Sequence, residues 1–188
     1  IKMVSNVYYR REKYCLSFTS YSKPVHILQN PGSQYYCTSA ATNTADDDIG
    51  NVTFLAMNNG IGTPALNNPA SSNLYTDFTS LTPQSVISGA SYPISVTQIN
   101  SGGFYVAHIN VYVDFNKNGL FEAGAETFVL GATNSNVGGN TLTGNISIPF
   151  TALPGITRMR IVLVEGATAT PSPCGTYTWG ETEDYSIL

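Results

Sequence analysis

From Tyr35 onward, short runs of alternating apolar and polar residues are separated by clusters of glycine, asparagine and proline. The clusters recur at intervals of about ten residues, which is the spacing of strands in a sandwich or barrel. No segment of useful length has the apolar period of an amphipathic helix. The pattern therefore predicts an all-β fold, a jelly-roll-like or immunoglobulin-like β-sandwich with strands at Ile49–Met57, Tyr75–Phe78, Tyr92–Ile99, Tyr105–Phe115, Glu126–Leu130, Thr141–Ile148, Thr157–Glu165 and Asp184–Leu188.

Two of these strands indicate which side chains are buried. In Tyr105–Phe115 every second residue is apolar, and the predicted core face consists of Ile109, Val111, Val113 and Phe115. In Thr157–Glu165, Arg158 and Arg160 alternate with apolar residues, so both should project from the opposite face. We expect them to be solvated surface charges.

The chain divides into two parts by charge. Residues 1–34 contain five basic residues and one acidic residue, which gives a net charge of +4. Residues 35–188 contain three basic and eleven acidic residues, which gives a net charge of −8. We predict a sandwich over 35–188 and an N-terminal extension over 1–34, which is too short to bury a core of its own. Its segments Asn6–Tyr9 and Tyr14–Tyr21 favour strands. We expect them to be ordered by another subunit or domain, for example by adding a strand to an open sandwich edge between chains or within one.

Composition narrows the class of protein. Only 11% of residues are charged, against about 25% in an average domain, and tyrosine occurs 12 times. This balance is typical of an extracellular β-protein, since turns use glycine and asparagine while strands favour threonine and tyrosine. A nucleic-acid partner is excluded because the predicted sandwich contains only three basic residues. No apolar run reaches 18 residues, so no membrane insertion is expected.

A possible metal loop follows the strand Tyr105–Phe115. Side-chain oxygens alternate before a glycine that permits a sharp turn, which is how one loop surrounds a calcium ion. The predicted ligands are Asp114, Asn116, Asn118, the carbonyl of Leu120, and Glu122 or Glu126, with Asp184 as a possible addition. The alternative is a hairpin turn without metal, since Asn-Gly is itself a strong turn signal.

The sequence gives little support for a catalytic site. The only histidines are His26 and His108, and neither accompanies a nucleophile motif. Glu181 and Glu183 could serve a glycosidase, but they also fit an ion-pair or calcium role. The run Asp46–Asp48 is expected to be a solvated acidic loop. We therefore predict no enzyme activity.

Several short motifs follow one another along the chain: Tyr35-Cys37-Thr38, Asp48-Ile49, Asn51-Val52-Thr53, Val111–Asn116 with Asn118-Gly119, Thr157–Arg160, Pro173-Cys174-Gly175 and Gly180-Glu181-Thr182-Glu183-Asp184-Tyr185. In order and spacing, these motifs resemble those of the GEVED domain over about residues 35–188. Thr182 replaces the valine of the family motif, and Asn118 replaces a usual aspartate. The second change lowers the charge available to a metal.

The resemblance implies a non-catalytic binding or structural module of a secreted or surface-anchored bacterial protein. Cys37 and Cys174 lie at the two ends of the resembling region, and we predict a disulfide between them. Two alternatives remain. One is a subunit of an extracellular filament assembled by strand addition. The other is a carbohydrate-binding module attached to a secreted hydrolase, with Tyr177 and Trp179 stacking on a glycan.

Overall fold

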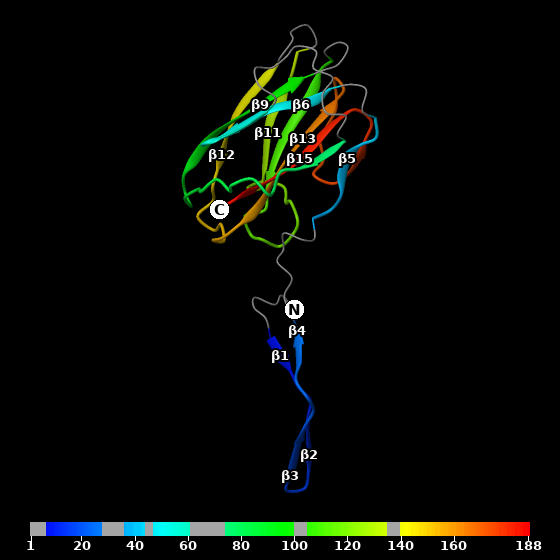
Figure 1. The fold of residues 1–188 in the computed structure, drawn as a ribbon, viewed down its shortest axis with the longest axis vertical. Helices are drawn as coiled ribbons and strands as arrows, with labels where there is room; N and C mark the ends of the chain where they lie inside the picture. The colour runs from blue at the N-terminus through cyan, green and yellow to red at the C-terminus, as the bar shows by residue number, and fades with distance from the viewer. Residues whose placement is uncertain (1–6, 28–35, 44–46, 61–73, 100–104, 135–139) are drawn as a thin grey trace.

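The computed structural model describes residues 7–27, 36–43, 47–60, 74–99, 105–134 and 140–188. Residues 36 onward form two β-sheets packed face to face (Figure 1), so the predicted β-sandwich is confirmed. The five-stranded sheet has the order β11 (Thr127–Ala132), β10 (Ala107–Val113), β13 (Thr157–Glu165), β15 (Gly180–Ile187) and β8 (Tyr75–Asp77). The four-stranded sheet has the order β12 (Thr141–Ser147), β9 (Ser91–Ile99), β6 (Asp48–Phe54) and β7 (Met57–Gly60). The described residues contain no helix long and apolar enough to span a membrane.

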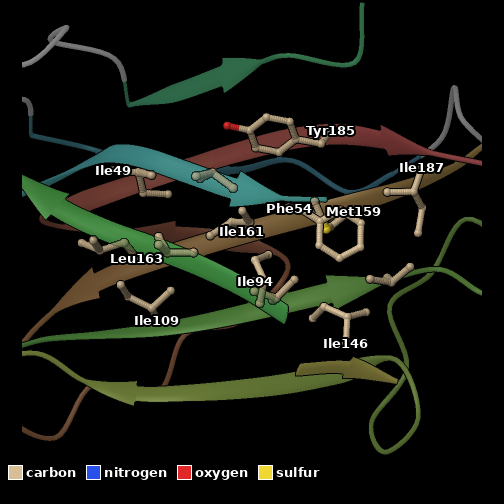
Figure 2. Packing of buried hydrophobic residues seen from close by; sticks show 14 of the residues in the cluster. Ile49, Phe54, Ile94, Ile109, Ile146, Met159, Ile161, Leu163, Tyr185 and Ile187 are labelled. Atoms are coloured by element: carbon tan, nitrogen blue, oxygen red, sulfur yellow. The ribbon is translucent and has the colours of Figure 1, made fainter. Parts of the chain in front are cut away.

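The core lies between the two sheets (Figure 2). Ile109, Ile161 and Leu163 of one sheet meet Phe54 and Ile94 of the other, and all five are fully buried. The predicted core face of β10 is confirmed because Ile109, Val111, Val113 and Phe115 all belong to this cluster. Side chains of this size each contribute about 1.5–3 kcal/mol when they leave water, so the sandwich has a core of its own.

The predicted strand Ile49–Met57 is wrong at one point. The chain turns at Leu55 and Ala56, and Phe54 pairs with Met57 in a hairpin between β6 and β7. Leu55 adopts a φ of 53°, which glycine or asparagine usually supplies in such turns. Because an apolar residue occupies the turn, periodicity alone does not reveal it. Residues 61–73, which follow β7, lie outside the described residues.

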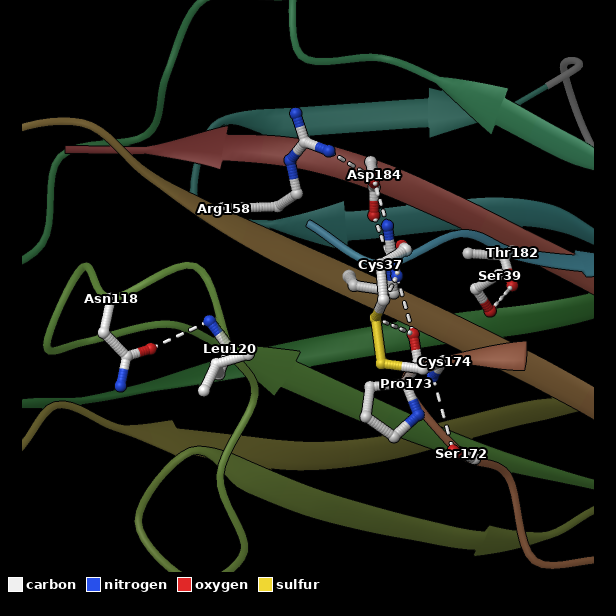
Figure 3. The surroundings of a disulfide bond; sticks show 11 residues. Cys37, Ser39, Asn118, Leu120, Arg158, Ser172, Pro173, Cys174, Thr182 and Asp184 are labelled. Atoms are coloured by element: carbon white, nitrogen blue, oxygen red, sulfur yellow. Dashed lines mark hydrogen bonds and ion pairs between the residues drawn. A yellow bond between two sulfur atoms is a disulfide. The ribbon is translucent and has the colours of Figure 1, made fainter. Parts of the chain in front are cut away.

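A small flap covers part of the outer face of the five-stranded sheet. It consists of β5 (Ser39–Ala41) and β14 (Gly175–Tyr177), which pair in parallel. The predicted disulfide Cys37–Cys174 is present beside this pair, with Cα atoms 5.5 Å apart (Figure 3). It joins residues 137 positions apart and holds the flap closed.

The N-terminal extension contains strands, as predicted, but they pair with one another. β1 (Val7–Tyr9) pairs with β4 (Val25–Ile27), and β2 (Glu12–Cys15) pairs with β3 (Phe18–Tyr21). None of these four strands joins a sheet of the sandwich, so the expected strand addition within one chain is wrong for the described residues. Figure 1 shows this ribbon lying apart from the sandwich.

Candidate functional site

Strand β15 carries the family motif and separates its side chains onto two faces. Tyr185 belongs to the core, so Glu181 and Glu183, which alternate with it, point to the interior of the sandwich. Thr182 and Asp184 point to the outer face, where the flap lies. All five side chains are buried. The motif therefore places carboxylates on both sides of one strand.

On the outer face, Asp184 accepts hydrogen bonds from two arginines of the neighbouring strand β13. Arg160 donates from Nε to Oδ1 at 2.7 Å and from Nη2 to Oδ2 at 2.8 Å, while Arg158 donates from Nη1 to Oδ2 at 2.8 Å. The hydroxyl of Tyr75 also donates to Asp184 Oδ2, at 3.0 Å. Such a bidentate arginine pair is stronger and more directional than a single contact.

Arg160 also holds the flap. Its Nη1 donates to the carbonyl of Cys37 at 2.8 Å and to the carbonyl of Pro173 at 2.6 Å, so one guanidinium contacts both segments that the disulfide joins. The expectation that Arg160 is a solvated charge is wrong, because only 2% of it is exposed. The strand pattern placed it correctly on the outer face, but the flap covers that face. Arg158 is less covered, with 15% of its side chain exposed.

In the interior, Glu181 and Glu183 are held by neutral donors. The hydroxyl of Thr76 donates to Glu181 Oε1 at 2.7 Å, and the amide of Ile49 donates to Oε2 at 3.1 Å. The hydroxyl of Tyr185 donates to Glu183 Oε2 at 2.7 Å. Burial and then the charge of Glu183 raise the pKa of Glu181 to about 9. Burial, together with the charge of Asp48, raises the pKa of Glu183 to about 8.

The acidic run before β6 also lies inside the protein. Asp47 and Asp48 are buried, so the expectation of a solvated acidic loop is wrong for both, while Asp46 lies outside the described residues. Sequence reasoning missed this burial because consecutive acids usually face water. The available signal was the position of Asp48 within the family's opening motifs.

The predicted metal loop is closed by its own hydrogen bonds. Buried Asp114 accepts from the amide of Asn118 at 3.1 Å and from the amide of Gly119 at 2.8 Å. Glu126 is also buried, and accepts from the amides of Asn116 at 3.2 Å and Glu122 at 3.0 Å. Burial raises the pKa of Glu126. These two carboxylates therefore fix the loop backbone by accepting hydrogen bonds from four of its amide groups.

The remaining predicted ligands meet around Glu122. The amide nitrogens of Asn116 and Asn118 donate to its two oxygens at 2.9 and 3.0 Å. The amide of Leu120 donates to Asn118 Oδ1 at 2.8 Å (Figure 3). A cavity of about 150 Å³ lies beside Asn116, Glu122 and Glu126.

The side chains of this loop are of the type that binds calcium, but their present positions do not form a calcium site. All are hard oxygen donors, which suits calcium and disfavours zinc. Nevertheless, no group of three His, Cys, Asp or Glu side chains in the described ranges is arranged to hold a metal. To bind calcium, Asn116 and Asn118 would have to turn their side-chain oxygens toward the ion. Their side-chain nitrogens would then give up the present hydrogen bonds to Glu122. Asp184, the additional predicted ligand, is already paired with the two arginines.

The predicted glycan-binding aromatics differ in their exposure. Trp179 is 39% exposed, while Tyr177 is half-buried and its hydroxyl shares a hydrogen bond with Thr182 at 2.8 Å. Tyr177 therefore supports the flap. The Nε2 atom of His108, on the outer face of β10, lies 3.3 Å from the carbonyl oxygen of Ala167.

The fold and the motif strand define an all-β module with buried charged residues. Residues 108–188 match the family described as the GEVED domain. The resemblance to this domain is therefore confirmed over the matched range. The motifs before residue 108 lie outside the matched range. Comparisons with curated proteins and with solved structures gave no significant match.

Proposed function

We propose that this chain is a non-catalytic binding or structural module of a secreted or surface-exposed bacterial protein, stabilised by calcium. The proposal rests on the contacts of the charged residues in the motif. Asp184 forms ion pairs with Arg158 and Arg160, and the two motif glutamates are buried between the sheets. A hydrolase would need carboxylates that reach a bound substrate.

The disulfide supports a location outside the cytoplasm. Cys37 and Cys174 close a long loop, and disulfides of this kind persist in oxidising compartments. The low content of charged residues points the same way. Export would therefore bring the chain to the conditions in which its flap stays closed.

Calcium is proposed at the loop Asp114–Glu126 on the basis of donor chemistry and burial. Glu126 is buried and accepts hydrogen bonds from the backbone amides of Asn116 and Glu122, and burial raises its pKa, so a nearby cation would stabilise the ionised carboxylate. The adjacent cavity offers the space for an ion. Extracellular calcium concentrations suit even weak loops of this type.

The proposal is tested by pairing an activity screen with a binding screen. We expect the purified chain to leave chromogenic glycosides, esters and peptides uncleaved at neutral pH, with or without calcium. Any cleavage that disappears in Glu181→Gln or Glu183→Gln would overturn the non-catalytic reading.

A glycan array run in parallel addresses the binding partner. Binding that survives in Val129→Ala but is lost in Trp179→Ala would identify a carbohydrate-binding module, since Val129 is another exposed apolar residue on the sandwich. Binding unaffected by Trp179→Ala would place the contact elsewhere on the domain.

A further inference from the structure

The N-terminal ribbon ends in large apolar side chains that face solvent. Leu16 lies at the turn between β2 and β3 and is 100% exposed, with Tyr14 and Phe18 exposed at 73% and 78%. We call Tyr14, Leu16 and Phe18 the ribbon tip. A two-stranded hairpin is only marginally stable in water, and clustered exposed apolar residues usually mark a contact surface. The tip would therefore gain stability from a partner that covers it.

A complementary apolar surface lies at one end of the sandwich. A cavity of about 160 Å³ opens there, and its lining includes Phe115, Ile148, Ala152 and Ile187. Leu153 and Leu188 also line it and are about half exposed. We call this cavity the end groove. An apolar cavity of about 150 Å³ holds a group the size of benzene, so one branched or aromatic side chain fits.

We infer that the ribbon tip of one chain docks into the end groove of a second copy. Leu16 enters the groove, and Tyr14 and Phe18 cover its rim. The two surfaces are different patches of the same chain, so the contact is head-to-tail and repeats into rings or open chains. This mode differs from strand addition, because β1 to β4 already pair with one another.

Charge favours the same partner. The extension carries a net charge of +4 and residues 35–188 carry −8, so two copies attract when the ribbon of one approaches the sandwich of the other. Arg11 directly precedes β2, the strand that leads to the tip, and Lys13 lies within it; both are exposed. Long-range attraction of this kind raises association rates and weakens with added salt.

Chain length disfavours docking within one copy. The tip at Leu16 lies eleven residues from Ile27, about 36 Å along an extended ribbon. The nine steps from Ile27 to Tyr36 span at most about 32 Å. Tyr36 contacts Asp114, next to the groove residue Phe115, so the chain enters the sandwich beside the groove. To reach its own groove, the ribbon would have to fold straight back on a nearly taut connection, which costs conformational entropy.

The test uses the full chain in a Cys15→Ser background, so that disulfide exchange through this exposed thiol cannot produce an assembly. We expect light scattering to show concentration-dependent association that Leu16→Asp abolishes and Leu153→Asp also abolishes. Val129→Asp, which alters an exposed residue on β11, serves as the matched control and should associate normally.

Mixing the two inactive variants separates head-to-tail docking from other contacts. The Leu16→Asp chain keeps its groove and the Leu153→Asp chain keeps its tip, so the mixture should form a one-to-one dimer that grows no further. A tip-to-tip contact predicts no complex in this mixture, and that result would overturn the inference. A monomeric parent chain at all concentrations, or association unaffected by Leu16→Asp, would overturn it as well. Circular dichroism melts of each variant show whether the sandwich remains folded.

Discussion

Arg160 and Asp184 stand directly opposite each other on β13 and β15, and the guanidinium contacts both oxygens of the carboxylate. The same guanidinium contacts the carbonyls of Cys37 and Pro173. The aspartate of the family motif thus orients the arginine that holds the flap against the sheet.

Replacing Asp184 by asparagine should strongly destabilise the protein. The change leaves two arginine charges at a buried position, and losing one partner of a buried pair typically costs about 3–5 kcal/mol. Urea unfolding of Asp184→Asn measures the loss. Glu12→Gln removes a carboxylate from the exposed ribbon and should have little effect. Equal midpoints for the two variants would show that the ion pair does not stabilise the fold.

The first residue of the motif should tolerate no side chain. Gly180 has a φ of 125°, and a Cβ there would lie 2.0 Å from the carbonyl oxygen of Leu163. Gly124 has a φ of 90° but open space around its Cβ position, so Gly124→Ala isolates the backbone cost. We expect Gly180→Ala to lower the unfolding free energy by at least about 3 kcal/mol and Gly124→Ala by about 1 kcal/mol. Similar thermal melts for both would argue against the steric explanation.

The buried glutamates should make the protein less stable as pH rises. In the unfolded chain both ionise near their ordinary pKa of 4.5, whereas in the fold the pKa values are about 9 for Glu181 and about 8 for Glu183. The protonated glutamates contribute fully to the unfolding free energy below pH 4.5, and this contribution is lost as the pH rises toward 8–9. Each glutamate can lower the unfolding free energy by at most about 1.4 kcal/mol for every pH unit.

Unfolding free energies measured from pH 5 to 9 examine this dependence. Glu181→Gln should flatten the decline and raise stability at the alkaline end, while Glu12→Gln should leave the curve unchanged. A decline of the same steepness in Glu181→Gln would show that the pH dependence arises from other groups.

Removing the disulfide should destabilise the sandwich while leaving its core intact. The bond spans 137 positions, and loop closure of this size contributes on the order of 5 kcal/mol in the chain-entropy description. The pair Cys37→Ser and Cys174→Ser should therefore unfold at much lower urea concentration than Cys15→Ser. Coincident unfolding curves would contradict the prediction.

Calcium should raise the melting temperature through the loop Asp114–Glu126. A ligand that binds only the folded state stabilises it by mass action, so a chelator should reverse the effect. Glu126→Gln removes the buried carboxylate and should abolish most of the calcium response, while Asp77→Asn changes an exposed acid outside the loop and should preserve it. A melt insensitive to both calcium and chelator would indicate a loop that works without metal.

Local patterns in the sequence predicted the strands well and their surroundings poorly. The bounds of β13 and the core face of β10 follow from simple alternation, because one side of each strand packs on the other sheet. The burial of Arg160 does not follow from alternation, because alternation does not reveal what covers an outer face. That cover comes from segments far apart in the chain, β5 and β14, which are too short for a recognisable pattern. The cysteine pair was the one sequence signal that connected them.

The position of the disulfide also determines how the domain would respond to mechanical load. Force applied between Tyr36 and Leu188 passes from Cys37 through the sulfur bridge to Cys174, and then along the last strand. The 137 residue steps between the two cysteines are bypassed, although unfolding them would otherwise release on the order of 450 Å of chain. The domain would therefore act as a nearly inextensible link under tension, and reduction of one covalent bond would turn it into a long tether.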